Sequence, residues 1–319
     1  MTAASGPPVG LICLVGPTGV GKTAASLHLA RTFNGVVINL DSRQVYAEFP
    51  IITAQPSPEE QAVCPHYLYG MLPAEEKLSA GRFAELAGSV AISHWRQGRL
   101  PLVVGGTGLY LRALVQGLAD IPPVPASIQR EVLAELDRLG PEALHARLAG
   151  VDPATAARLA PRDRQRIARA LEVHAATGRP LTWWHAQQAQ AAASRPFRAL
   201  ILHLDQPNDL LHPRLGQRIA LMLEAGAREE IARAWARLPD ETAPGYTGIG
   251  CAELLAWHLG RLSLAEAVHL WERNTRAYVK RQRTWFRKEA GRVDLAPDEL
   301  DRMTHLTGLF VEQIRNSPP

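Results

Sequence analysis

The stretch GPTGVGKT, from Gly16 to Thr23, has the glycine spacing of a loop that wraps around phosphate groups. It follows the apolar run VGLICLV and precedes AASLHLARTF, an order that predicts a buried strand, a tight turn and a helix. The N–H groups of such a turn and of the helix N-terminus point at phosphate oxygens. Lys22 adds a positive charge, and the Thr23 hydroxyl is a candidate ligand for Mg²⁺. The residues expected to line this site are Gly16, Pro17, Thr18, Gly19, Val20, Gly21, Lys22 and Thr23. The motif does not say whether the bound phosphate is transferred or departs.

Three further apolar runs predict strands of the same sheet. They are Gly35–Asp41, Leu100–Gly106 and Arg198–Asp205, and each is short, continuous and placed between helical segments. This pattern, like that of Val9–Val15, is typical of parallel strands that are covered on both faces. We therefore expect an α/β fold with a P-loop NTPase-like parallel sheet core flanked by helices.

The segment after DIPPVP (Asp120–Pro125) differs from the rest because it shows helical periodicity without any strand pattern. We expect residues 120–196 to form an all-helical insertion domain. Residues 1–119 and 197–319 would then form the catalytic core, with helices that bind RNA at its C-terminal end. The clearest of these helices are predicted at Leu210–Gly226 and Ala265–Gly291.

Composition narrows the class of protein. A chain of 319 residues with 46% apolar residues can bury a full core, and a net charge of +4 with a pI near 9.1 makes clusters of charge more informative than the total. The cysteines Cys13, Cys64 and Cys251 are far apart and fit neither a disulfide framework nor a metal site, which favours a reducing compartment. We expect a cytoplasmic monomer with no membrane partner, because the chain has neither a signal-peptide pattern nor an apolar run long enough for a bilayer.

Two side chains are predicted to join the phosphate loop at one edge of the sheet. Asp41 ends the second predicted strand, and Thr107 follows the third in GGTGLY. Because the carboxyl ends of parallel strands meet at one edge, both residues should face the same crevice as the loop. A P-loop ATPase usually carries an acidic residue after a central strand. Here only Asp205 is placed to take that role, so a small-molecule or nucleoside kinase remains an alternative.

Two basic clusters indicate a polyanionic partner. RDRQRIARA places arginines on one face of a helix in the insertion, although a solvated charged face is the usual explanation of such a run. From Arg273 to Arg292 there are eight Lys or Arg residues, and four of them fall at helical spacing: Arg276, Lys280, Arg283 and Arg287. Like charges at this spacing repel each other, so we expect them to face phosphates. Tyr278, Trp285 and Phe286 lie among them and suit either stacking on unpaired RNA bases or a core.

The motifs GPTGVGKT, DSRQVY, TAQP, LVVGGTGLY, RDRQRIARALEV, PRLGQRI and VKRQRTWFR together resemble bacterial tRNA dimethylallyltransferases, in which they occur in this order. The resemblance covers nearly the whole chain. It implies that a dimethylallyl group passes from dimethylallyl diphosphate to the exocyclic N6 amine of the adenine 3′ of the anticodon, in tRNAs that read codons beginning with U. Diphosphate would then be the leaving group. The implied partners are the tRNA anticodon stem-loop and dimethylallyl diphosphate, and the implied cofactor is Mg²⁺, held by Thr23.

The resemblance also implies roles for individual residues. Asp41 would be the general base that takes a proton from the adenine amine, with Thr107 hydrogen-bonding near the same nitrogen. Arg218 in PRLGQRI would neutralise the diphosphate. The residues expected to contact tRNA are Asp41, Ser42, Arg43, Gln44, Thr107, Arg130, Gln165, Arg166, Ile167, Ala168 and Arg169, with Lys280, Arg281 and Arg283 from the second basic cluster.

The chain departs from the family pattern at four positions outside the expected reaction centre. Cys251 and Ala252 stand where the family has an aromatic and a basic residue. Gln55 replaces a common lysine, and Gly70 replaces a common acidic residue. One tRNA contact near Cys251 is therefore expected to be altered.

Three other functions stay open at the level of sequence. A kinase could use the same loop with the arginine-rich insertion as its lid. A prenyltransferase of free adenine nucleotides could share the crevice but would not need the Arg273–Arg292 cluster. A non-enzymatic RNA-binding protein would explain that cluster and leave the crevice without a purpose.

Overall fold

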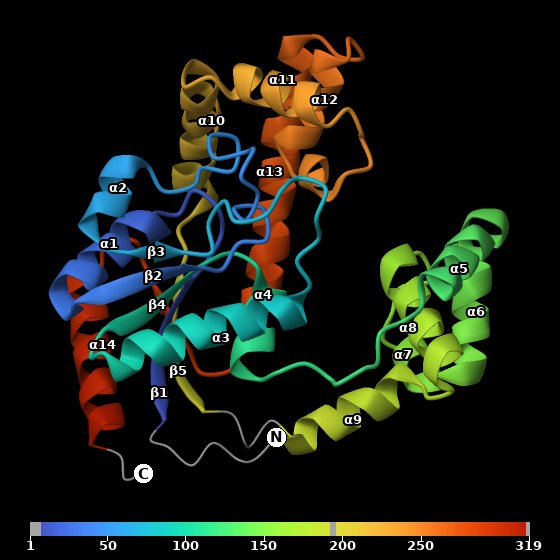
Figure 1. The fold of residues 1–319 in the computed structure, drawn as a ribbon, viewed down its shortest axis with the longest axis horizontal. Coiled ribbons are helices and arrows are strands. Elements are labelled where there is room, and N and C mark those ends of the chain that lie inside the picture. Colours follow the sequence, from blue (N-terminus) through green and yellow to red (C-terminus); the bar gives the residue numbers. More distant parts are fainter. Residues whose placement is uncertain (1–7, 192–195, 317–319) are drawn as a thin grey trace. The chain divides into compact units, whose positions relative to one another are not determined.

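The structure is a computed structural model that describes residues 8–191 and 196–316. The chain divides into two compact units, one formed by residues up to Val115 together with those from Pro196 onward, and the other by Gln116–Arg195. The sequence analysis placed these boundaries at 119/120 and 196/197. Figure 1 shows a sheet covered by helices in the first unit and only helices in the second.

A six-stranded parallel sheet forms the centre of the first unit, with the order β3-β2-β4-β1-β5-β6. The strands are β1 (Val9–Val15), β2 (Gly35–Asn39), β3 (His66–Tyr67), β4 (Leu100–Gly105), β5 (Phe197–Leu204) and β6 (Arg292–Leu295). The four predicted strands are confirmed and form the middle of the sheet. The edge strands β3 and β6 were not predicted, because two and four residues are too short to show a pattern.

Helices cover both faces of the sheet. Those of this unit are α1 (Lys22–Phe33), α2 (Pro58–Val63), α3 (Ala80–Arg96), α4 (Gly108–Val115), α10 (Asn208–Glu224), α11 (Ala227–Arg237), α12 (Cys251–His258), α13 (Leu264–Phe286) and α14 (Leu300–Arg315). Leu11 and Cys13 of β1 pack in one cluster with α3 and α4, whereas Ile12 and Leu14 pack in another with α1 and α14. Burial of alternate side chains on opposite faces explains why the strands are continuous apolar runs. The expected α/β fold with flanking helices is confirmed.

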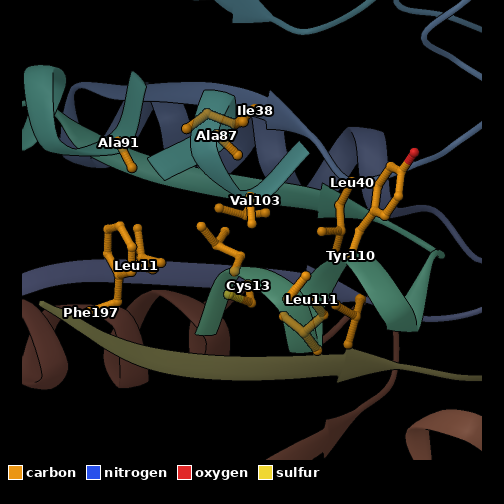
Figure 2. Packing of buried hydrophobic residues seen from close by; sticks show 14 of the residues in the cluster. Leu11, Cys13, Ile38, Leu40, Ala87, Ala91, Val103, Tyr110, Leu111 and Phe197 are labelled. Carbon is orange, nitrogen blue, oxygen red and sulfur yellow. The ribbon is translucent and has the colours of Figure 1, made fainter. Parts of the chain in front are cut away.

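The first of these clusters lies between β1, β4 and the helices α3 and α4. Figure 2 shows Leu11, Cys13 and Val103 from the strands together with Ala87 and Ala91 of α3. The small alanines let α3 approach the sheet closely, and no labelled strand residue in this cluster leaves more than a small fraction of its surface exposed. The strands are therefore held rigidly up to their carboxyl ends.

A second layer, made of helices, stands beyond the sheet. Figure 1 shows α10, α11, α12 and part of α13 gathered there. Its own core includes Phe49 and Tyr246, whose rings meet edge to face with centroids 5.5 Å apart. Helix α13 belongs to both layers, because Trp271 is buried in the helical core and Phe286 in the sheet core. This one helix therefore ties the helical layer to the sheet.

The described residues of the second unit form helices and connecting segments without a strand, as expected for the insertion. Its helices are α5 (Ala126–Leu139), α6 (Pro141–Val151), α7 (Pro153–Ala156), α8 (Arg164–Thr177) and α9 (Leu181–Ala191). Leu136, Leu148 and Leu171 lie in a separate small core. Asp152 is buried and accepts hydrogen bonds from the backbone N–H groups of Thr155 (3.0 Å) and Thr182 (3.0 Å), so it fixes the starts of α7 and α9.

Two further features of the described residues concern the cysteines and the length of the helices. Cys13, Cys64 and Cys251 are all free and buried. Across residues 8–191 and 196–316, no helix has both the length and the apolar character that crossing a bilayer requires.

The core predicts a large cost for truncation of a central strand. Leu102 of β4 is fully buried, and Leu102→Ala should lower the free energy of unfolding by about 2–5 kcal/mol through lost burial and a cavity. Leu221→Ala, the same change at a side chain 63% exposed on α10, should cost about 0.5 kcal/mol or less. Urea unfolding followed by circular dichroism compares the two, and equal losses would contradict the described core.

Candidate active site

The phosphate loop connects β1 to α1 and is shaped by its glycines. Gly19 and Gly21 have φ angles of 79° and 101°, in the left-handed region that glycine alone adopts easily. A Cβ atom on Gly16 would lie 2.2 Å from the carbonyl oxygen of Leu204, so this glycine lets β1 and β5 touch at their ends. Because α1 begins at Lys22, the N–H groups of its first turn open onto the mouth of the loop. The predicted strand, turn and helix are confirmed.

Lys22 closes the loop upon itself. Its Nζ donates hydrogen bonds to the carbonyl oxygens of Gly16 (2.9 Å) and Pro17 (2.7 Å). Burial lowers the pKa of Lys22 to about 7; the nearby Asp41 carboxylate opposes this shift and the Arg218 guanidinium adds to it. The ammonium group is thus only partly protonated near neutral pH, and a bound anion would restore its charge.

Asp41 lies in a turn that ends β2 two residues earlier than predicted. The fully buried Asn39 holds this turn, because its Oδ1 accepts from Asp41 N (2.7 Å) and its Nδ2 donates to Asp41 O (2.9 Å). The Asp41 carboxylate accepts a hydrogen bond from Arg43 N at 2.9 Å through Oδ1. The backbone thereby fixes the direction of the carboxylate.

Thr107 lies in the turn between β4 and α4 and connects three segments. Its N–H donates to the Leu40 carbonyl at 3.0 Å, and its hydroxyl oxygen accepts from Ser42 N at 3.0 Å. It also shares a hydrogen bond with Tyr278 of α13, whose pKa is raised by burial. Thr107 is absent from the described linings of the two cavities around the loop. It therefore holds the Asp41 turn in place from behind.

Two adjoining cavities meet beside Asp41. The phosphate cavity, about 300 Å³, is lined by Thr18, Gly19, Gly21, Lys22 and Thr23 of the loop, whereas Val20, which was expected to line it, is 0% exposed and packs in the core. The second cavity, about 310 Å³, has one hydrophobic wall made of Ile52, Leu215, Ile219, Met222, Ile249 and Trp271, and we call it the apolar cavity after this wall. Its other walls are polar and include Arg43, Tyr278 and Arg281. Thr18, Asp41, Thr53 and Arg218 line both cavities. The crevice therefore has an anion-binding end and an apolar end, with Asp41 and Arg218 in the shared wall.

Arg218 and Arg214 extend from α10 into the phosphate cavity. They are four residues apart, so they share one face of the helix. Burial lowers the pKa of Arg218, while Asp41 and Glu60 act in the opposite direction. Arg214 donates to Gln206 Oε1 at 3.0 Å. Sequence reasoning selected Arg218 and missed Arg214, although the spacing in PRLGQRI contained the signal.

Gln282 of α13 was also missed by sequence reasoning. Its Oε1 accepts from Thr18 N at 3.0 Å, and its Nε2 donates to the Gly106 carbonyl at 3.1 Å. The side chain is 3% exposed, and a Cβ atom on Gly106 would lie 1.9 Å from Nε2. The sequence analysis considered only the basic and aromatic residues of α13. Gln282 lies on a neutral face of this helix, which contacts both glycine-rich turns.

The basic residues of α13 point to different places. Lys280 lines a groove between α10 and α13 with Arg276, in a cavity of about 410 Å³. Arg281 lines the apolar cavity, and its guanidinium carbon is 5.5 Å from the centre of the Tyr278 ring. The cationic side chains of α13 thus fall into two groups. Arg281 lines the crevice, whereas Arg276 and Lys280 line the separate groove.

Arg283, which was expected to contact tRNA, is paired within the fold. Its side chain is 14% exposed and pairs with Asp205 at 2.8 Å, although it also lines the groove that contains Lys280. It also donates to the Gln206 carbonyl and to Asn208. Its charge is neutralised within the fold, and it fastens α13 to the end of β5. Asp205, the carboxylate that a kinase would need, is occupied by this pair and lies outside the described lining of the phosphate cavity.

The residues of the second unit that were expected to contact tRNA include both exposed and buried side chains. Arg130, Gln165, Arg166 and Arg169 are exposed. Ile167 and Ala168 are 0% and 3% exposed and belong to the core of the unit. The expectation for these two is corrected, since their side chains pack among the helices.

Two of the four family departures are neighbours. A Cβ atom on Gly70 would lie 3.0 Å from Gln55 Oε1, so the loss of charge at both positions is one local change. Gln55 instead donates to the Tyr46 carbonyl at 2.8 Å. Cys251 is 1% exposed in the helical core, where burial raises its pKa, whereas Ala252 is exposed. The position of Cys251 therefore contributes packing.

Comparison with known proteins gives a consistent result. The family model described as IPP transferase matches residues 44–289. A protein named tRNA dimethylallyltransferase from Nitratidesulfovibrio vulgaris is 54% identical, over 96% of this chain and 95% of the relative. A protein of the same name from Desulfovibrio desulfuricans is 53% identical, over 94% of this chain and 92% of the relative.

Solved structures match across both units. The full-length tRNA isopentenylpyrophosphate transferase from Bacillus halodurans is 31% identical with a TM-score of 0.70, covering 96% of this chain and 98% of that one. A eukaryotic dimethylallyltransferase acting on tRNA is 29% identical with a TM-score of 0.78, covering 97% of this chain and 80% of that one.

The lowered pKa of Lys22 predicts proton uptake when an anion binds. At pH 8 the free amine is largely neutral, since its pKa is about 7. Inorganic diphosphate should raise this pKa, so its binding should take up as much as about one proton more in the native protein than in Lys22→Met. The difference should vanish below about pH 6, where Lys22 is already charged. Calorimetry in buffers of different ionisation enthalpy measures the number of protons taken up. Equal proton uptake by both proteins at pH 8 would show that the pKa of Lys22 is not lowered in this way.

Proposed function

Because the chain belongs to the IPP transferase family, we propose that it transfers the dimethylallyl group of dimethylallyl diphosphate to the N6 amine of the adenine 3′ of the anticodon in tRNA. The tRNAs concerned would be those that read codons beginning with U. The observation that carries the proposal is the meeting of an anion-binding cavity and an apolar cavity at the Asp41 carboxylate. This arrangement suits a reaction in which a phosphate group leaves and an uncharged carbon chain is passed on.

The phosphate cavity suits the leaving group. As the allylic C–O bond breaks, its electron pair goes to the diphosphate, where negative charge builds up. Lys22, Arg214 and Arg218 and the N–H groups at the start of α1 provide positive charge and donors at this place. Fixed donors stabilise developing charge without reorganising during the reaction.

The apolar cavity suits the isoprenoid chain and the base that receives it. Ile219 and Met222 supply hydrophobic contact, and a dry wall protects an electron-poor allylic carbon from capture by water. The adenine nitrogen forms its new bond to this carbon, and the Asp41 carboxylate in the shared wall accepts the proton that the amine loses.

The oxygen donors around the loop fit Mg²⁺. The Thr23 hydroxyl lines the phosphate cavity, and Mg²⁺ commonly binds one or two protein oxygens together with substrate phosphates and water. No group of three or more His, Cys, Asp or Glu residues within the described ranges could hold a metal without such help. When bound, the ion would neutralise part of the diphosphate charge.

An RNA substrate agrees with the basic surfaces better than a free nucleotide does. Lys280 and Arg276 line a groove outside the two cavities, which a free nucleotide within the crevice would not use. The target adenine must leave its stack to reach Asp41, and that cost of a few kcal/mol is smallest in a loop. We assign the anticodon stem-loop as the partner on this basis.

The protein is proposed to act as a monomer in the cytoplasm. Both cavities are lined by residues of the first unit of a single chain, so a second copy is not needed to complete them. Three free, buried cysteines are consistent with a reducing compartment.

Loss of the carboxylate tests the role of Asp41. Asp41→Asn retains an acceptor for Arg43 N and removes the base, so turnover should fall by roughly 10²–10⁴-fold. The assay follows labelled dimethylallyl diphosphate into unmodified tRNA with Mg²⁺, and in parallel with EDTA and with ATP, ADP or AMP as acceptors. Label should enter tRNA alone and only with Mg²⁺.

The matched control is Asp240→Asn. Asp240 accepts from Thr242 N at 2.9 Å in a similar turn, but at an exposed site away from the crevice. It should leave turnover unchanged. Near-normal turnover by Asp41→Asn would remove Asp41 as the base, and label in free nucleotides would change the substrate class.

Removal of one positive charge tests the groove. Lys280→Gln should weaken tRNA binding and reduce the slope of log K against log salt concentration by about 1, because one phosphate contact is lost. Lys77→Gln makes the same change at an exposed loop position before α3 and should alter neither value. Filter binding at several salt concentrations measures both, and equal slopes for the two variants would exclude the groove from the tRNA interface.

A further inference from the structure

One face of α13 contacts the ends of the strands that carry the active site. Tyr278, Gln282 and Trp285 are four and three residues apart, so they lie on the same side of the helix. Tyr278 shares a hydrogen bond with Thr107, and a Cβ atom on Gly108 would lie 2.0 Å from Trp285 Nε1. Between them, Gln282 is the member that reaches the phosphate loop.

The amide of Gln282 joins two turns that come from different strands. Its carbonyl end faces the N–H of Thr18 after β1, at 3.0 Å, and its amino end faces the carbonyl of Gly106 after β4, at 3.1 Å. This donor and acceptor pattern sets the orientation of the amide. The side chain is 3% exposed, so water cannot easily replace either hydrogen bond.

The connection continues from Gly106 to the Asp41 turn. Thr107 follows Gly106 directly, donates its N–H to the Leu40 carbonyl at 3.0 Å and accepts from Ser42 N at 3.0 Å. Leu40 and Ser42 are the chain neighbours of Asp41. A path of hydrogen bonds and one peptide link therefore runs from the phosphate loop through Gln282 to both sides of the proposed base.

We propose that Gln282 is a positioning residue for the transfer, which fixes the phosphate loop relative to Asp41. It touches neither cavity in the described structure, so it acts through Thr18 and Gly106. The proposal rests on the proposed function, in which the leaving group occupies the loop and the base is Asp41. A shift between the two sites would leave each able to bind its ligand but would misalign the reacting atoms, and small misplacements of this kind cost up to about 100-fold in rate.

Other contacts hold α13 in the fold without Gln282. Trp271 and Phe286 are buried in two cores, and Arg283 pairs with Asp205 at 2.8 Å. A variant at position 282 should therefore keep the helix in place and lose the link between the turns. We therefore expect the variant to remain folded and to be slower in the chemical step.

The test compares two isosteric replacements of an amide on the same helix. Gln282→Met removes both hydrogen bonds and should lower kcat for tRNA prenylation by roughly 10–100-fold, with KM for dimethylallyl diphosphate and the Kd of inorganic diphosphate changed by less than about threefold. The control is Asn274→Leu, which removes a hydrogen bond of 2.6 Å to Glu253 in the helical layer. It should leave kcat unchanged. Thermal unfolding checks that both variants are folded.

A third variant and a double variant test whether a loss of kcat comes from misalignment of the reacting groups or only from a change in structure. Gln282→Glu keeps an acceptor for Thr18 N but places a carboxylate oxygen against the Gly106 carbonyl, so it should also lower kcat. In the Asp41→Asn background, Gln282→Met should cost much less than in the native protein, because there is no base left to align.

The results separate the possible failures. A Gln282→Met protein with kcat within twofold of the native value, or one whose loss of kcat matches an equal loss of diphosphate affinity, would overturn the positioning role. So would full additivity with Asp41→Asn. If the native protein transfers no label to tRNA, the proposed function fails first and the role of Gln282 falls with it.

Discussion

The attachment of α13 to the strand ends is the constraint on which the active site depends. The phosphate loop and the Asp41 turn come from separate strands, β1 and β2, which both pair with β4. Gln282 adds a side-chain link beyond the strand ends, through hydrogen bonds to Thr18 and Gly106 at 3.0 and 3.1 Å. Only glycine at position 106 leaves room for its amide. A helix from near the C-terminus must therefore pack against the loop near the N-terminus to complete this link.

Burial of positive charge shapes the crevice itself. Lys22 donates hydrogen bonds to the carbonyls of Gly16 and Pro17, and burial lowers its pKa to about 7. Burial also lowers the pKa of Arg218, which lines both cavities together with Asp41. Such a site is costly until an anion arrives, since buried cations need a counter-charge. The cavity beside it adds a hydrophobic wall, and Asp41 and Arg218 lie where the two cavities meet.

Much of the fold and part of the site followed from local patterns. The four central strands, the loop and α1 were predicted because continuous apolar runs and glycine spacing act over a few residues. Arg283, Ile167 and Ala168 were assigned to the tRNA contact surface, yet the structure buries them or pairs them internally. A helical face can be identified from its spacing, but whether it meets solvent, a core or an acidic partner depends on segments far away in the chain. Gln282 was missed for the same reason, because a neutral polar residue in a helix carries no local sign of its distant partner, whereas the i, i+4 spacing of Arg214 and Arg218 was visible in the sequence.

By itself, the sequence determined the phosphate loop, the alternation of buried strands and helices, and the basic character of α13, since each depends on neighbours in the chain. Only the tertiary structure shows that Asp41 lies where the phosphate cavity and the apolar cavity meet. Likewise, only the tertiary structure shows that Gln282 joins two turns and that Arg283 forms an ion pair with Asp205. These are contacts between residues separated by as many as 264 positions. Hydrogen bonds and apolar contacts act only over short distances, and hydrogen bonds also require a specific direction. Contacts between distant residues therefore form only when the whole unit has folded.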